Sequence, residues 1–171
     1  MLLDDLLRED LALVFCGTAL SDTSHRLSAY YAHPGNRFYA ALASAGFTPH
    51  QLAPAEYPKL LQWGIGLTDL NKTEHGADSA LSADAFDADA LRDKIERCAP
   101  DYLAFTSKRA AQEYFKVPRV EYGLQRQRIG STRTFVLPSP SGRATRYWDE
   151  APWRALAGLY QAARSRRRRR S

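Results

Sequence analysis

Two runs of apolar residues, each followed directly by a short loop, limit the folds open to this sequence. The run Leu11–Cys16 leads into the loop Gly17–Ser21, and the run Thr134–Pro138 leads into Ser139–Arg143. Short apolar runs that end at Gly, Pro or Ser are typical of buried β-strands. Open α/β sheets bind their ligands in loops that leave the carboxyl ends of such strands. The sequence therefore predicts an α/β fold with a ligand site where these two loops meet.

Strand and helix patterns alternate along the rest of the chain. Besides Leu11–Cys16, strands are expected at Tyr102–Thr106, at Arg133–Leu137 and within Gly64–Leu70, where the strand ends near Asp69. The spacing of apolar residues predicts helices at Leu2–Arg8, Asn36–Ala45, Glu56–Gln62, Asp87–Ala99, Lys108–Phe115 and Asp149–Ala163. The polar stretch Asn71–Ala85 has little periodicity and is expected to be the longest loop. Alternating strands and helices favour a parallel sheet covered on both faces, in one domain over residues 1–163.

The positive charge of the chain is concentrated at one end. The formal net charge is +5, and Arg164 together with Arg166–Arg170 supplies six positive charges. Without these six, 18 basic residues face 19 acidic ones and the net charge is −1. Residues 164–171 are therefore predicted to form a disordered basic tail that attracts phosphate in a salt-dependent way. A solvated tail without a role of its own is the alternative.

Composition excludes several classes of protein. No apolar run approaches the ~20 residues of a membrane span, and the acidic amino-terminal segment lacks the basic flank of a secretory signal. A cytoplasmic location is therefore expected. Cys16 and Cys98 are too few for an iron–sulfur or four-cysteine zinc site, and the four histidines show no ligand spacing. We expect no metal and no cofactor.

Several short motifs resemble those of the mismatch-specific uracil-DNA glycosylases, which are single-domain members of the uracil-DNA glycosylase superfamily. They occur in the family's order between about Leu13 and Tyr160, and they are Phe15-Cys-Gly17, His33–Phe38, Ala45–Thr48, Gly66-Leu-Thr68 and Val136–Gly142. The resemblance implies a three-layer αβα sandwich around a four-stranded, mainly parallel sheet. It also implies a monomer that binds DNA, flips a uracil or another mismatched, damaged base out of the duplex and hydrolyses its N-glycosidic bond without a metal or cofactor.

The same resemblance assigns roles in a base-binding pocket to the first loop and the residues after it. The backbone around Gly17, Thr18 and Ala19 and at Tyr31 would hydrogen-bond the polar edge of uracil, and the Tyr31 ring would stack on the flipped base. Ser24 would line the pocket. Asn36, with Arg37, would hold the loop in place.

The second loop resembles the segment that grips DNA in this family. Ser139, Pro140, Ser141 and Gly142 would contact the DNA backbone, and Arg143 falls at the position that penetrates the duplex. An arginine there can hydrogen-bond the base left without a partner, whereas the apolar wedge common in such enzymes mainly supports unstacking. Further phosphate contacts are expected from Lys72 and Lys108.

The sequence departs from the family at the usual catalytic position. The family places Asn or Asp two residues after the first-loop glycine, but here that residue is Ala19, which cannot orient water. Loss of the base passes through an oxocarbenium-like sugar, so a carboxylate elsewhere can stabilise the positive charge. We favour Asp69, which follows the second strand, over Asp22 in the first loop. Lys72 would pair with Asp69 or contact a phosphate.

Three functions remain open at this point. The first is a monofunctional glycosylase that acts on uracil and tolerates other deaminated bases. The second is a module of the same superfamily that binds uracil or abasic DNA with little or no turnover. The third, an unrelated α/β hydrolase with a serine nucleophile, is disfavoured because the chain has no Gly-x-Ser-x-Gly motif.

Overall fold

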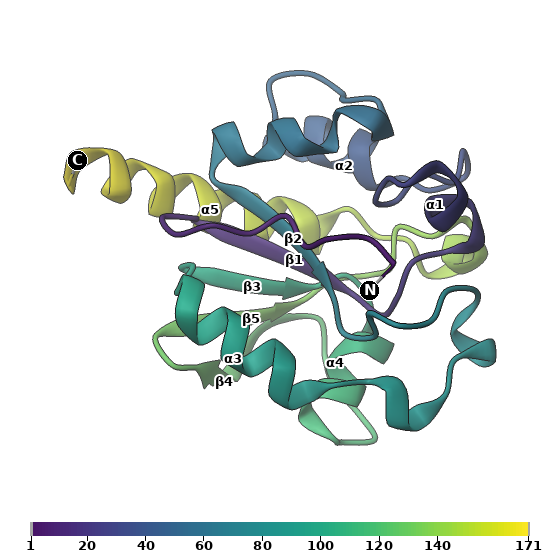
Figure 1. The fold of residues 1–171 in the computed structure, drawn as a ribbon. Helices are drawn as coiled ribbons and strands as arrows, with labels where there is room; N and C mark the ends of the chain where they lie inside the picture. The colour runs from purple at the N-terminus through teal and green to yellow at the C-terminus, as the bar shows by residue number, and fades with distance from the viewer. Residues whose placement is uncertain (1, 171) are drawn as a thin grey trace.

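A mixed sheet of five strands forms the centre of the computed structural model, which describes residues 2–170 (Figure 1). The strand order is β2-β1-β3-β5-β4. Four strands are mutually parallel, and their bounds are β1 Leu13–Gly17, β2 Ile65–Asp69, β3 Tyr102–Phe105 and β5 Thr132–Val136. The fifth, β4 (Gly123–Ile129), pairs antiparallel with β5. The α/β class is as expected, but the expected strand number of four is wrong.

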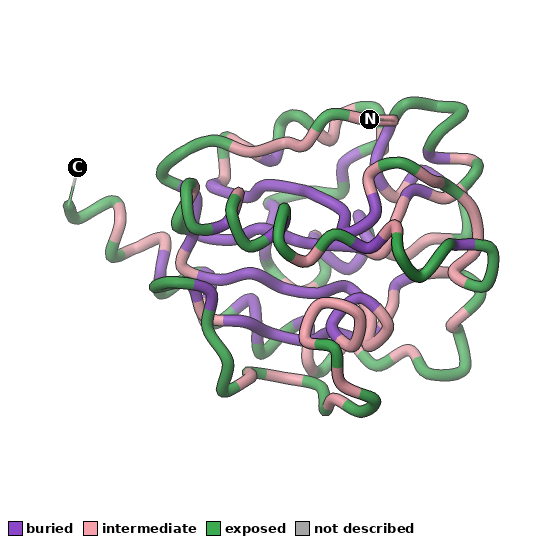
Figure 2. Tube along the Cα trace, turned by 60° about the horizontal axis from the view of Figure 1, so that its bottom comes forward, coloured by how far each residue is buried: buried purple, intermediate pink, exposed green. Residues whose placement is uncertain are grey.

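Helices cover both faces of the sheet. One layer holds α2 (Phe38–Ala45), the 3₁₀ segment η1 (Pro54–Trp63) and α5 (Ala151–Arg170), and the other holds α3 (Ala88–Cys98) and α4 (Lys108–Phe115). The four parallel strands between them are almost wholly buried, whereas the edge strand β4 is mostly exposed (Figure 2). Burial on both faces explains why β1 is continuously apolar: Leu13 and Phe15 pack in the core of the α2 and α5 layer, while Val14 and Cys16 pack in the core of the other.

Aromatic side chains fix the helices that stand behind the first loop. Phe15 of β1 stacks on Trp153 of α5 at a ring-centroid distance of 5.8 Å and meets Phe38 of α2 edge-on at 5.2 Å. The Trp153 indole N–H donates a hydrogen bond to the Pro138 carbonyl oxygen at 3.1 Å. The starts of α2 and α5 are therefore anchored next to the two loops that follow β1 and β5.

Near the amino terminus one predicted helix is absent and one short helix was not predicted. No helix forms at Leu2–Arg8; this segment instead runs along β2, where Leu6 makes an antiparallel bridge to Leu67. A short helix, α1 (Asp22–Leu27), begins after Ser21, whose side chain accepts a hydrogen bond from the Ser24 N–H. The loop predicted at Asn71–Ala85 is present and contains two single 3₁₀ turns, η2 (Asp78–Ala80) and η3 (Ala83–Ala85).

The basic segment after residue 163 is helical. Helix α5 continues to Arg170, and Arg167 pairs with Asp10 at 2.8 Å and with Asp101 at 2.5 Å. These two ion pairs hold the end of α5 against the body of the protein, and the sequence pattern did not reveal them. The disorder expected for residues 164–170 is therefore not observed. Ser171 lies outside the described residues. None of the helices within residues 2–170 combines the length and apolar character needed to cross a bilayer.

Candidate functional site

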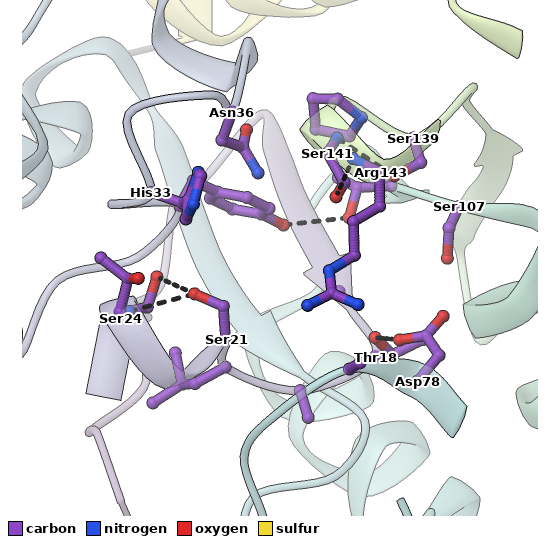
Figure 3. A pocket seen from close by; sticks show the side chains of 18 of the residues that line it. Thr18, Ser21, Ser24, His33, Asn36, Asp78, Ser107, Ser139, Ser141 and Arg143 are labelled. Carbon is purple, nitrogen blue, oxygen red and sulfur yellow. Dashed lines mark hydrogen bonds between the residues drawn. The ribbon is translucent and has the colours of Figure 1, made fainter. Parts of the chain in front are cut away.

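A cavity of about 870 Å³ opens at the carboxyl ends of the four parallel strands (Figure 3). Its size falls in the range of small-molecule sites. It is lined by residues 17–24 after β1, by five residues between positions 30 and 36, by Asp69 and residues 76–79, by residues 106–107 after β3, and by residues 139–144 after β5. The two loops predicted to meet therefore do lie on one pocket.

Direct backbone contacts hold the second loop against the segment that follows the first. The Arg37 N–H donates to the Pro140 carbonyl oxygen at 2.8 Å. Gly142 packs so closely on Gly35 that a Cβ atom at position 142 would lie 3.1 Å from the Gly35 carbonyl oxygen. Asn36 stabilises the same region, because its side-chain oxygen accepts a hydrogen bond from the Phe38 N–H at the start of α2.

Tyr31 presents an aromatic ring that is held from behind. One face of the ring stacks on the fully buried Phe38, with centroids 3.9 Å apart and planes 18° apart, so only the opposite face and the edge are open to a ligand. The hydroxyl hydrogen-bonds with the Thr106 hydroxyl at 3.0 Å. The backbone has φ 54°, a left-handed conformation that is uncommon for a non-glycine residue and occurs often at functional sites.

Asp69 places a buried carboxylate on the inner wall of the pocket. The residue is 4% exposed and ends β2 directly beside Gly17 of β1. Its Oδ2 atom has no hydrogen-bond partner among residues 2–170. Burial raises the pKa of Asp69 from 3.8 to about 6, against the lowering effects of Lys72, Lys94 and the Gly17 N–H. An acidic group with an elevated pKa in a pocket is typical of a functional site.

Lys72 does not occupy its predicted place. Its ammonium pairs with Asp5 at 3.0 Å and donates to the Tyr30 hydroxyl at 3.0 Å, and its side chain is only 14% exposed. It lies outside the pocket lining and does not pair directly with Asp69, although its charge acts on that carboxylate. Asp5 also binds Lys94 at 2.7 Å, so a partly buried ion cluster stands behind Asp69. The ion pair with Asp5 explains why Lys72 turns inward.

Asp22, the alternative to Asp69, lies at the rim of the same pocket. Its side chain is 76% exposed, and its Oδ1 atom is 2.6 Å from Nδ1 of His75, whose ring stacks on that of His25. Ser24 is buried beside it and accepts hydrogen bonds from the Ala32 N–H at 2.9 Å and the Ser21 hydroxyl at 3.1 Å. Ser24 therefore lines the pocket and also braces the first loop.

The loop after β5 is braced by its own serines. The Ser139 hydroxyl oxygen accepts from the Ser141 N–H, and the Ser141 hydroxyl oxygen accepts from the Arg143 N–H, both at 3.2 Å. Arg143 begins a 3₁₀ segment, η4 (Gly142–Tyr147), together with Gly142, and extends into the pocket toward Thr18 and Asp78 (Figure 3). It makes no ion pair within residues 2–170. Lys108 lies outside the pocket lining, 4.4 Å from the centre of the Tyr122 ring.

A family model described as the uracil DNA glycosylase superfamily matches residues 5–158. The chain belongs to the uracil DNA glycosylase superfamily. A similar solved structure is the solution NMR structure of a proposed uracil DNA glycosylase from Methanosarcina acetivorans, with 26% sequence identity and a TM-score of 0.66. The match covers 92% of this chain and 96% of the other. The resemblance seen in the motifs is thereby confirmed at the level of the superfamily.

Ala19 is the departure that matters most in this uracil DNA glycosylase superfamily member. It lines the pocket, as predicted, but offers no polar side-chain atom there. Gly17, immediately before Thr18, leaves space in front of Asp69: a Cβ atom at position 17 would lie 2.7 Å from Asp69 Oδ1. The pocket of this superfamily member therefore holds a carboxylate at the end of β2 in place of a polar group at position 19.

Sequence reasoning missed several polar residues of this superfamily site, and Asp78 and Thr106 make the most direct contacts with predicted ones. Asp78 accepts a hydrogen bond from the Thr18 hydroxyl at 2.8 Å, and Thr106 binds the Tyr31 hydroxyl. Asp78 falls in the aperiodic stretch after β2, where no local pattern fixes the chain. Thr106 is the last residue of a predicted strand, so the rule that sites gather at strand ends would have found it.

Proposed function

We propose that this protein is a monofunctional DNA glycosylase that removes uracil, preferentially from G·U mismatches, and leaves an abasic site. The observation that supports this most strongly is the buried carboxylate of Asp69 on the wall of a pocket whose open ring is Tyr31. A flat base stacked on that ring would bring its deoxyribose next to the first loop. An acidic group at this place suits a reaction that develops positive charge on a sugar.

In the proposed reaction, the bond between the anomeric carbon and the base breaks first, and its electron pair leaves with uracil. The ionised carboxylate of Asp69 stabilises the oxocarbenium-like sugar. Water then adds to the anomeric carbon, and its proton passes to Asp69 or to solvent. Extrusion of the base costs least at a mismatch, which favours a G·U pair over a correct pair.

The second loop supplies the contact with the duplex in this proposal. Arg143 has no ion pair within the described residues and can enter the space that the flipped base leaves. Ser139, Ser141 and Gly142 would meet the DNA backbone beside it. We place this activity in a monomer in the cytoplasm, with tolerance for other deaminated bases.

An abasic-site assay with excess protein on a short G·U duplex tests the proposal. Asp69→Asn should abolish excision while duplex binding persists, because the amide keeps the shape of the side chain but cannot carry the stabilising charge. Asp22→Asn is the matched control, because Asp22 lies at the rim of the same pocket, and it should cleave at close to the unmodified rate. Full excision by the Asp69→Asn protein would remove Asp69 from the mechanism.

A second candidate, a module that binds uracil or abasic DNA with little turnover, is favoured by one observation. Ala19 stands in the pocket where the family motif has a polar residue. The same assay separates the two functions. Tight, uracil-dependent binding by the unmodified protein without any abasic product would support the binding module and contradict the glycosylase.

A further inference from the structure

The last turns of α5 carry exposed arginines that no acidic group neutralises. The helix projects beyond the body of the molecule (Figures 1 and 2). Arg166, Arg169 and Arg170 are exposed, and none of them makes an ion pair within residues 2–170. They are spaced three and four residues apart, so they share one side of the helix. This spacing concentrates positive charge on a single accessible surface.

A second group of arginines lies at the same end of the sheet. Arg126 and Arg128 are exposed on the edge strand β4, and Arg128 stands opposite Arg133 in the register of β4 and β5. The hairpin between these strands lies at the amino end of β5, and α5 contacts β4. We call these two groups together the basic end, and its members are Arg126, Arg128, Arg133, Arg166, Arg169 and Arg170.

The basic end and the pocket lie at opposite ends of the sheet. Trp153, near the start of α5, donates a hydrogen bond to the Pro138 carbonyl oxygen beside the pocket. At the other end of α5, Arg167 forms ion pairs with Asp10 and Asp101, which precede β1 and β3. Fourteen residues of α-helix separate Trp153 from Arg167, a rise of roughly 21 Å. Because the pocket opens at the carboxyl ends of those strands, its mouth faces away from the basic end.

The pocket itself is poorly suited to attract a polyanion. Its lining contains the carboxylates of Asp22, Asp69 and Asp78 against the single guanidinium of Arg143. The lining itself therefore supplies little long-range attraction for phosphate. Within residues 2–170, the basic end gathers positive charge without ion-pair partners around a helix that Arg167 anchors.

We propose that the basic end is a second DNA-binding surface, which holds the phosphate backbone of one duplex segment while the pocket engages another. Like charges at i, i+3 and i+4 repel by roughly 0.2–0.5 kcal/mol per pair on a helix, and phosphates placed between them relieve that repulsion. The helix is already ordered by Arg167, so little conformational entropy is lost on binding. The inference concerns binding alone and does not require the proposed excision.

A bridging experiment tests this surface on undamaged DNA. Beads that carry a 30-base-pair duplex are mixed with the full-length protein and with a free, fluorescent duplex of the same length, at low salt. The unmodified protein should retain the free duplex on the beads, and this retention should vanish as salt rises, since phosphate contacts release counterions. The triple variant R166Q/R169Q/R170Q should lose at least ten-fold of the retention, and R126Q/R128Q should lose part of it.

The matched control removes three cations elsewhere, as K59Q/R92Q/R119Q, and should keep most of the bridging. Equal bridging by the triple variant and the control, or no bridging by the unmodified protein, would overturn the proposal. Excision of uracil from a 12-base-pair duplex is measured on the same proteins. Because excision from one short duplex needs no second DNA segment, loss of excision there concerns the proposed function. Loss of bridging alone concerns the basic end.

Discussion

Gly17 lies so close to Asp69 that any side chain at position 17 would collide with the Asp69 carboxylate. A Cβ atom on Gly17 would lie 2.7 Å from Asp69 Oδ1, nearer than real Cβ contacts allow, and 3.3 Å from the Tyr31 hydroxyl oxygen. The Thr106 hydroxyl oxygen would lie 3.5 Å from the same Cβ atom. Gly17 therefore keeps open the place where three groups of the candidate site converge.

Replacing Gly17 by Ala should displace the Asp69 carboxylate and reduce excision of uracil by about 100-fold, the size of effect that a misplaced catalytic group produces. Binding of a uracil-containing duplex should change much less, since the second loop is untouched. Single-turnover abasic-site formation and duplex titration measure the two effects. An unchanged excision rate would show that the space in front of Asp69 is not used.

The pH dependence of excision should report the ionisation of Asp69. Burial raises its pKa to about 6, and the proposed mechanism needs the ionised form. The single-turnover rate should therefore rise with pH, about ten-fold per unit below pH 6, and level off above it. Measurements between pH 5 and 8 check this. A residual rate in Asp69→Asn should lack this rise, whereas the same rise in that variant would assign it to another group.

Asp69→Asn should also stabilise the fold above pH 6. Because the folded-state pKa of Asp69 lies above the value of 3.8 in the unfolded chain, its contribution is present below pH 3.8 and is lost as pH rises to about 6. The loss amounts to ~3 kcal/mol. Urea unfolding of both proteins at pH 7.5 measures the gain. Equal stability of the two proteins at that pH would mean that the buried carboxylate is stabilised in a way the contacts do not show.

The buried strands and the loops that follow them could be predicted from the sequence. The edge strand and the amino-terminal segment could not. Leu11–Cys16 was identifiable because a strand buried on both faces is continuously apolar. The strand β4 was missed because its sequence, Gly-Leu-Gln-Arg-Gln-Arg-Ile, has the polar residues of an exposed edge. Leu2–Arg8 has a helical pattern, but pairing of Leu6 with Leu67 overrides it. Such tertiary contacts leave no trace in local spacing.

In the candidate site, too, residues at strand ends could be predicted, whereas residues placed by long-range contacts could not. Asp69 was placed in the pocket because it ends a predicted strand, and Gly17 and Ser139 were placed there for the same reason. The inward turn of Lys72 depends on Asp5, 67 positions earlier in the chain, and Asp78 reaches Thr18 across an aperiodic loop. Neither contact follows from a local pattern, since both are made by segments that meet only in the folded protein.

Tyr31 should act through its ring more than through its hydroxyl. Tyr31→Phe removes the hydrogen bond to Thr106 and should cost about 1 kcal/mol of stability, while excision falls by no more than a few-fold. Tyr31→Ala removes the surface stacked on Phe38 and should reduce excision by ten-fold or more, since a stacked base contributes about 1–3 kcal/mol. Excision rates and melting temperatures of both variants check this. Equal loss of excision in the two would assign the role to the hydroxyl.

Gly142 should control how closely the two loops approach. A Cβ atom at this position would lie 3.1 Å from the Gly35 carbonyl oxygen, so Gly142→Ala must move one loop by a few tenths of an ångström. Because Arg143 and Ser141 move with it, we expect duplex affinity to fall by about ten-fold, roughly 1.4 kcal/mol. The excision rate at saturating protein should change less than the affinity.

Gly158 offers the matched control for that substitution. It lies on the exposed side of α5, and a Cβ atom there meets nothing within 4 Å. Gly158→Ala should therefore leave duplex affinity and excision unchanged and stabilise the protein by up to ~1 kcal/mol through helix propensity. Fluorescence titration with a G·U duplex, together with thermal unfolding, compares the two variants. If Gly142→Ala binds DNA as tightly as Gly158→Ala, the contact between the loops does not set the DNA-binding geometry, because the same added methyl group would then be harmless in both places.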